Sequence, residues 1–119
     1  MKDHKYLSPS LLSADFGDLK GALKLVEEKG SSYVHVDVMD GHFVPQVTYG
    51  QPVISSIRKY SSIPFDVHLM VEKPENSIES YIEAGADLVT FHIEATAHAD
   101  RCVQLIHEKG KKAGIAICP

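Results

Sequence analysis

Three residues of the types that bind divalent metals lie on two neighbouring predicted strands. His35 and Asp37 are two positions apart in the run YVHVDVMD (33–40), and His68 lies in the run FDVHLMV (65–71). Side chains at positions i and i+2 of a strand point the same way, and neighbouring strands lie about 4.8 Å apart, so the three side chains can converge. Two imidazoles and a carboxylate with open positions suit one divalent ion such as Zn²⁺, Fe²⁺, Co²⁺ or Mn²⁺. The alternative is a set of hydrogen-bonded polar residues inside a barrel, although a carboxylate buried beside two imidazoles needs a compensating cation or proton.

Three further residues are candidates for this site. Met39 and Met70 each follow a predicted ligand by two positions on the same strand face. They either fill gaps in the core or form an apolar, polarizable wall beside a reacting carbon. Ser10 lies where the first predicted strand enters the site, and it is either a turn residue or a contact of the site.

Other polar residues are assigned structural or solvated roles. His92 and Glu94 are expected to face inward as structural residues, and Cys118 is expected to pack at a strand end. Asp40 begins a turn after the run 33–40, and His42 is expected at the rim of the site. Three histidines at polar positions are expected to be solvated: His4, His98 and His107.

Strand-like and helical segments alternate along the chain. Five short runs rich in β-branched and apolar residues are predicted as strands: 6–13, 33–40, 65–71, 87–95 and 112–119. Four segments with helical periodicity are predicted as helices: one with an apolar stripe from Phe16 to Val26 that Gly30 closes, and others at about 53–61, 74–84 and 100–109. This alternation predicts βαβ units with right-handed crossovers and a parallel sheet.

The two faces of the predicted strands differ, which distinguishes between two α/β architectures. In the run 33–40 the valines lie on one face, and His35 and Asp37 lie on the other. A central strand of an open sheet is covered by helices on both sides and reads as a nearly continuous apolar run, so the alternation favours a barrel with a polar interior. The sequence also lacks the nucleotide-binding patterns GxGxxG and GxxxxGK. Since complete barrels typically have about 250 residues, the 119 residues are predicted to form one domain (1–119), about half of a TIM-type (β/α)8 barrel with about four βα units and a fifth strand.

Composition and charge exclude several functional classes. The chain has 12 basic and 16 acidic residues, a net charge of −4, which gives no electrostatic reason to expect binding to nucleic acid or to an anionic membrane. No apolar run approaches the roughly 18 residues of a membrane span, and a secretory signal is not expected. The two isolated cysteines suggest a reducing cytoplasm without a disulfide scaffold. The exposed edges of half a barrel predict a homo-oligomer.

Several motifs together resemble the ribulose-phosphate 3-epimerase family. They are SPSLLSADF, HVDVMDGHFVP, DVHLM and EAGAD, with HIEA on the fourth predicted strand, and they run in order over essentially the whole chain. The resemblance implies a cytoplasmic TIM barrel that needs a divalent metal and interconverts the sugar phosphates D-ribulose 5-phosphate and D-xylulose 5-phosphate. In this reaction a proton leaves C3, α to the C2 carbonyl, and a proton returns on the opposite face of an enediolate. Two acid/base groups are therefore needed, and a cation stabilises the enediolate charge.

The resemblance also implies roles for individual residues. His35, Asp37 and His68 match three of the family's four metal ligands, and Asp37 matches one of its two acid/base carboxylates. The positions that contact substrate or line the reacting carbons are matched by four residues: Ser10, His68, Met39 and Met70. The second carboxylate, which is also the fourth ligand, and the glycine-rich phosphate site belong to a later part of the family's barrel. The resemblance therefore implies that these 119 residues alone lack epimerase activity.

The residues leave three alternatives open. Allulose-6-phosphate 3-epimerase shares the metal site and differs in its sugar. A truncated half-barrel that self-associates without catalysis is the second alternative, and a metal-binding module without turnover is the third. Cys118 stands where the family more often has asparagine.

Overall fold

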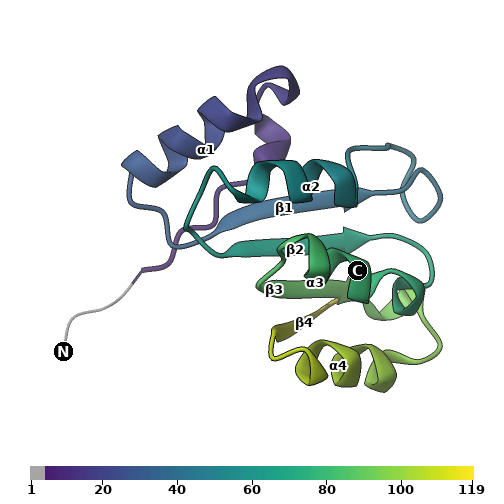
Figure 1. Ribbon diagram of the computed structural model, residues 1–119. Coiled ribbons are helices and arrows are strands. Elements are labelled where there is room, and N and C mark those ends of the chain that lie inside the picture. Colours follow the sequence, from purple (N-terminus) through teal and green to yellow (C-terminus); the bar gives the residue numbers. More distant parts are fainter. Residues whose placement is uncertain (1–4) are drawn as a thin grey trace.

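The computed structural model describes residues 5–119 (Figure 1), so the expectation for His4 lies outside the described residues. Within them, a four-stranded parallel sheet has the order β1-β2-β3-β4. Its strands are β1 (Val34–Met39), β2 (Phe65–Met70), β3 (Leu88–His92) and β4 (Lys112–Ala116). The helices are α1 (Leu19–Glu28), α2 (Gln51–Arg58), α3 (Ile78–Ala84) and α4 (Ala99–Glu108). The predicted α/β alternation with a parallel sheet is confirmed.

The strands have one apolar and one polar face, as predicted. The apolar side chains of the first three strands are buried: Val34, Val36, Val38, Phe65, Val67, Leu69, Val89 and Phe91. The register places Asp37 beside His68, and Met39 beside Met70. Since side chains at paired positions point to the same face, the register gathers the polar side chains of β1 and β2 on the face opposite the core.

The helices cover the apolar face with their own buried residues. These are Leu19, Leu23, Ile54, Ile57, Ile78, Tyr81, Ile82, Ala84, Cys102 and Ile106. Helix α1 begins later than the apolar stripe suggested, because the Asp18 carboxylate accepts the N–H of Gly21 at 3.1 Å and so caps the helix at this point. Phe16 lies in a 3₁₀ turn before this cap and stays 43% exposed. Gly30 follows α1 with a φ of 73°, which confirms its predicted role as the closing residue.

The first predicted strand, 6–13, is present only as a single parallel bridge between Ser10 and His35. The segment does lie along β1, because the N–H of His35 donates to the carbonyl of Pro9 at 2.9 Å. Proline has a fixed φ and no N–H to donate, so Pro9 cannot continue a ladder on both sides. After Ser10 the chain turns into a 3₁₀ helix, Leu11–Ser13. The predicted strand was too long, but the segment still delivers Ser10 to the polar face.

Two other predicted elements are shorter in the structure. The strand predicted at 87–95 ends at His92, and a 3₁₀ turn (Ile93–Ala95) follows, which leaves Ile93 44% exposed. The helix predicted at 74–84 consists of a 3₁₀ turn followed by α3, because Ser77 between them has a non-helical φ of −129°. Both differences concern the ends of elements and leave the order of the sheet unchanged.

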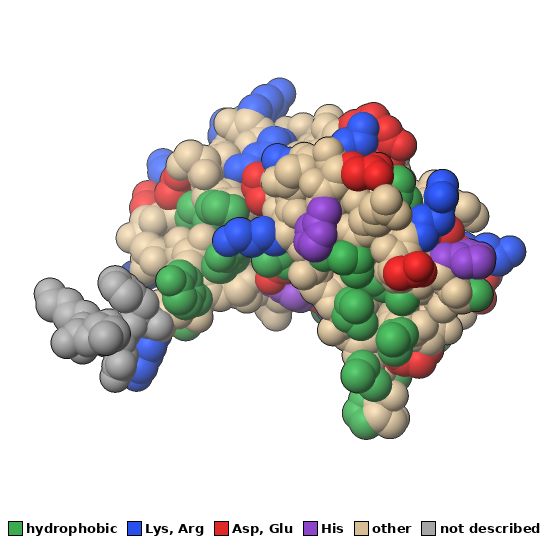
Figure 2. Space-filling model, turned by 90° about the horizontal axis from the view of Figure 1, so that it is seen from below, with side chains coloured by type: hydrophobic (Ala, Val, Ile, Leu, Met, Phe, Trp, Pro, Cys, Tyr) green, Lys and Arg blue, Asp and Glu red, His purple; other side chains and the backbone are tan. Residues whose placement is uncertain are grey.

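The molecule has the form of an arch. The helices lie on one side of the sheet (Figure 1), and the space-filling view shows a hollow on another side of the molecule (Figure 2). His35, His68 and Met70 on the polar face of the sheet are half-buried, whereas the apolar face is closed by helices. Within residues 5–119, every helix is too short or too polar to cross a membrane.

Candidate metal and acid/base site

A cluster centred on Asp37 occupies the polar face of β1 and β2. Asp37 is only 9% exposed. Its Oδ1 lies 3.0 Å from Nε2 of His35 and 3.3 Å from Nδ1 of His68. Its Oδ2 accepts a hydrogen bond from the hydroxyl of Ser10. The structure therefore brings together the three predicted metal ligands, and Ser10 joins them.

The ring of His35 is held from both sides. Its Nδ1 contacts Oδ2 of Asp66 at 2.8 Å, while its Nε2 faces Asp37. The hydroxyl of Ser8 donates to the same oxygen of Asp66 at 3.1 Å. A carboxylate on one imidazole nitrogen fixes the ring and its tautomer, so that the other nitrogen is directed at a ligand. Asp66 had no assigned role in the sequence analysis, although it lies two positions before His68 and beside His35 in the register.

His68 connects the cluster to β3. Its Nε2 lies 2.8 Å from Nε2 of His92, so one ring donates and the other accepts. The His92 ring stacks on His68 with centroids 4.9 Å apart. The centroid of the Phe43 ring lies 5.0 Å from that of the His92 ring. His92 is 7% exposed and faces inward as expected. Its contact with His68 was not predicted. In the strand register His68 is paired with Thr90, and His92 lies two positions further along β3.

Burial and hydrogen bonding shift the pKa values in this cluster. Hydrogen bonds to Asp37 and Asp66 raise the pKa of His35 to about 10, against the opposing effect of burial. Burial acts to raise the pKa of Asp37, but hydrogen bonds from His35, His68 and Ser10 outweigh it and hold this pKa below its ordinary range. Burial and the neighbouring His68 lower the pKa of His92. Without a bound cation, Asp37 is thus a carboxylate and His35 an imidazolium at neutral pH.

The donor set of the cluster fits a divalent cation. One possible ligand atom from each of His35, Asp37 and His68 lies within 4.8 Å of the others. The carboxylates of Asp37 and Asp66 both face the His35 ring, and the negative charge that retains a proton there equally favours a metal ion. Two imidazoles and one carboxylate also leave coordination positions open for oxygen atoms of a substrate.

The remaining predicted residues of the site surround this cluster. Met39 and Met70 are paired in register at the carboxyl ends of β1 and β2, on the same face as the cluster. His42 is exposed in the loop after β1, where a rim position was expected. Glu94 differs from the expectation of an inward residue, and Cys118 from that of a packed one, because both side chains are exposed. The two histidines expected to be solvated, His98 and His107, are exposed.

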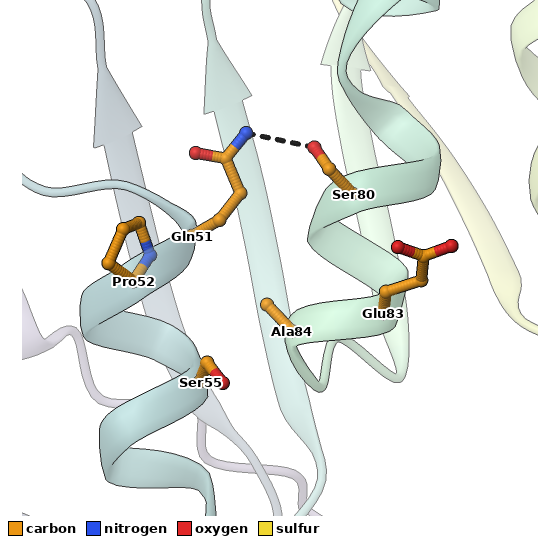
Figure 3. A pocket seen from close by; sticks show the side chains of 6 residues that line it. All are labelled: Gln51, Pro52, Ser55, Ser80, Glu83 and Ala84. Atoms are coloured by element: carbon orange, nitrogen blue, oxygen red, sulfur yellow. Dashed lines mark hydrogen bonds between the residues drawn. The ribbon is translucent and has the colours of Figure 1, made fainter.

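A separate cavity of about 350 Å³ lies between α2 and α3 (Figure 3). Nε2 of Gln51 donates to the hydroxyl of Ser80 across it at 2.8 Å. Its lining consists of Gln51, Pro52, Ser55, Ser80, Glu83 and Ala84. Glu83 is the one charged side chain in this lining and has neither a base nor a second carboxylate beside it there. The cavity is therefore a weaker candidate for chemistry than the cluster around Asp37.

Comparison with known proteins supplies the family. A family model described as "Ribulose-phosphate 3 epimerase family" matches residues 6–119. The chain belongs to the ribulose-phosphate 3-epimerase family. The resemblance carried by the sequence motifs is thereby confirmed, and the parallel sheet with alternating helices is consistent with part of the TIM barrel of this family.

Individual members of the epimerase family match nearly the whole chain. A ribulose-phosphate 3-epimerase of Treponema pallidum is 53% identical over 113 residues, which cover 95% of this chain and 52% of that protein. A ribulose-phosphate 3-epimerase of Bacillus subtilis is 46% identical over 113 residues, again 95% of this chain and 52% of the relative. One of Aquifex aeolicus is 44% identical over 115 residues, with 97% and 52% covered. The chain thus spans about half the length of the curated relatives it matches.

Proposed function

We propose that this chain forms the metal-binding part of a sugar-phosphate 3-epimerase, with Asp37 as one of two acid/base groups. The observation that carries the proposal is the convergence of His35, Asp37 and His68 on the polar face of the sheet. The names of the relatives support ribulose phosphate as the substrate, in preference to the hexose alternative. The proposed reaction interconverts D-ribulose 5-phosphate and D-xylulose 5-phosphate, in the pentose phosphate pathway and in the cytoplasm.

Asp37 is proposed to take the proton from C3 in one direction and return it in the other. Hydrogen bonds from His35, His68 and Ser10 keep its carboxylate ionised and fix its orientation. When bound, the divalent ion supplies charge stabilisation for the enediolate oxygens. We assign the ligand role to His35, Asp37 and His68. Met39 and Met70 are proposed to form the apolar wall beside the reacting carbons.

Within residues 5–119, the cluster around Asp37 contains no candidate for the second acid/base group. An epimerase needs a proton donor on the opposite face of the planar enediolate. Asp66 is the other carboxylate in contact with the cluster, and it is bonded to His35 and Ser8. We therefore expect the 119 residues alone to show no turnover of ribulose 5-phosphate, and measurable turnover by the purified chain would contradict this expectation.

A chimera tests the catalytic role of Asp37. In the Treponema pallidum relative, the matched segment is replaced by this chain, so that the remaining part of the barrel is supplied. We expect this chimera to exchange the C3 proton of ribulose 5-phosphate with deuterated water, measured by NMR. Asp37→Asn should lower the exchange rate by about 10²- to 10⁴-fold, the usual contribution of a positioned acid/base group.

The control for this experiment is Glu28→Gln, which removes one exposed carboxylate at the end of α1. It should leave the exchange rate within a factor of about two, since an exposed charge remote from the site has little effect. An Asp37→Asn chimera that is folded, by circular dichroism, and exchanges the C3 proton at the rate of the control would overturn the assignment.

A further inference from the structure

A second group of potential metal ligands lies at the carboxyl ends of β3 and β4. His92 is the last residue of β3, Glu94 lies in the turn that follows, and Cys118 lies two positions after β4. One ligand atom from each of the three lies within 4.8 Å of the others. This group shares no residue with the three predicted ligands of the first site, His35, Asp37 and His68.

The buried imidazole of His92 points an unpaired nitrogen toward this group. Its Nδ1 is buried and has no hydrogen-bond partner, and the nearest Glu94 oxygen is 3.8 Å away, beyond hydrogen-bond distance. Its Nε2 is already engaged by His68 at 2.8 Å. The ring is 7% exposed, stacks on His68 and lies 5.0 Å from the ring of Phe43, so it is packed against two other rings. A buried polar nitrogen without a partner is uncommon, and a bound cation is one physical explanation.

The backbone holds the other two donors beside this nitrogen. The N–H of Cys118 donates to both carboxylate oxygens of Glu94, at 2.5 Å and 3.3 Å. This hydrogen bond fastens the segment after β4 to the turn after β3. It therefore holds Cys118 and the Glu94 carboxylate close to the imidazole of His92.

We propose that His92, Glu94 and Cys118 form a second metal site, selective for a cation of the Zn²⁺ or Co²⁺ class. One thiolate, one imidazole and one carboxylate are ligands that these ions accept in tetrahedral geometry, whereas Mg²⁺ and Ca²⁺ prefer oxygen ligands throughout. Three protein ligands leave the fourth position open. The proposal does not depend on epimerase activity, because it rests on residues that the proposed reaction does not use.

Absorption spectroscopy with Co²⁺ distinguishes this site from the first. Cobalt bound to a thiolate gives an intense charge-transfer band in the near ultraviolet, and the first site contains no sulfur ligand among His35, Asp37 and His68. We expect this band when Co²⁺ is added to the full chain in the presence of a non-thiol reductant. Cys118→Ser should abolish the band and Glu94→Gln should weaken Co²⁺ binding at least tenfold.

Two matched variants complete the test. Cys102→Ala removes the other, buried cysteine and should leave the band unchanged. His35→Ala removes a ligand of the first site and should retain the band, so a failure of the first site is distinguishable from a failure of the second. The proposal is overturned if saturating Co²⁺ gives no thiolate band, if the band survives Cys118→Ser, or if it forms only on dimerisation in a sedimentation experiment.

Discussion

One hydrogen bond determines which nitrogen of His35 faces the candidate metal site. Asp66 accepts from Nδ1 at 2.8 Å, which leaves Nε2 directed at Asp37. Without this carboxylate the ring is free to take the other tautomer, in which Nε2 carries a hydrogen and cannot bind a metal. Asp66 is therefore expected to position a ligand without being a ligand itself.

Asp66→Asn should weaken metal binding at the first site by about 10- to 100-fold, the usual effect of removing the carboxylate behind a metal-bound histidine. The measurement is a calorimetric titration with Zn²⁺ in a Cys118→Ser background, so that only the first site is observed. Ser8→Ala serves as the control, because it removes another hydrogen bond of Asp66 and leaves the contact with His35 in place. Equal affinities of the Asp66→Asn variant and the parent would show that the tautomer is set in another way.

The residues of the site differ in how far their sequence positions reveal them. The spacing of His35 and Asp37 on one strand, and the place of His68 on the next, were enough to predict their convergence. The contacts of Asp66 and His92 were found only in the structure, since they depend on the register between strands and on the direction in which each ring turns. Periodicity predicts the face on which a side chain lies, and it carries no information on the partner it meets there.

At the scale of the elements, hydrogen bonds between loops connect the carboxyl ends of neighbouring strands. Asp40, directly after β1, accepts the N–H groups of His42 and Phe43 through Oδ1 and that of Glu72, after β2, through Oδ2, all at 2.8 to 2.9 Å. The carbonyl of Ala95, after β3, accepts a backbone N–H from the loop after β2 at 3.1 Å. These bonds hold the rim around the site, which long loops alone would leave mobile.

Asp40→Asn should destabilise the fold by about 1–2 kcal/mol at pH 7, because the amide NH₂ cannot accept the N–H of Glu72. Burial acts to raise the pKa of Asp40, but backbone N–H groups of Glu72, His42 and Phe43 lower it overall. A group with a lowered pKa stabilises the fold above its unfolded pKa, about 3.9, and this contribution is lost as the pH falls through the lower, folded value. The difference between the variant and the parent should therefore shrink below about pH 4.

Urea unfolding followed by circular dichroism between pH 7 and pH 3 provides the measurement for Asp40→Asn. Glu28→Gln is the matched control, since its carboxylate is exposed at the end of α1, and it should change the free energy of unfolding by less than about 0.5 kcal/mol. A constant difference between Asp40→Asn and the parent over this whole pH range would contradict the assigned role.

The order and type of the elements followed from the sequence more closely than their ends did. Alternating faces and helical stripes predicted five strands and four helices, and the structure contains four of these strands and all four helices. The errors lie where a local effect stops an element: Pro9 in the segment predicted as a strand, Asp18 as a cap and Ser77 with its non-helical φ. Hydrophobic periodicity does not record such effects, because each depends on the backbone conformation of one residue.

At the scale of the whole molecule, the sheet has an edge at β4. Within the described residues, β4 pairs with β3 on one side and has no strand on the other. Two isoleucines near this edge are exposed, Ile115 at 49% and Ile117 at 72%. An edge strand with apolar side chains favours pairing with another chain. The homo-oligomer expected from the sequence stays a prediction.

We therefore expect the 119-residue chain to associate with itself through the β4 edge, as measured by sedimentation velocity over a range of concentrations. Ile115→Lys should raise the concentration at which half of the chain is associated by roughly tenfold or more, because burying an isoleucine contributes about 1.5–3 kcal/mol and a lysine on an edge strand opposes pairing. Leu25→Lys is the matched control, since Leu25 is 56% exposed on α1, which does not adjoin the open edge in the strand order. The control should associate like the parent. A chain that stays monomeric at all concentrations would show that the open edge at β4 needs no partner. If both lysines weaken the self-association equally, the association takes place on another surface.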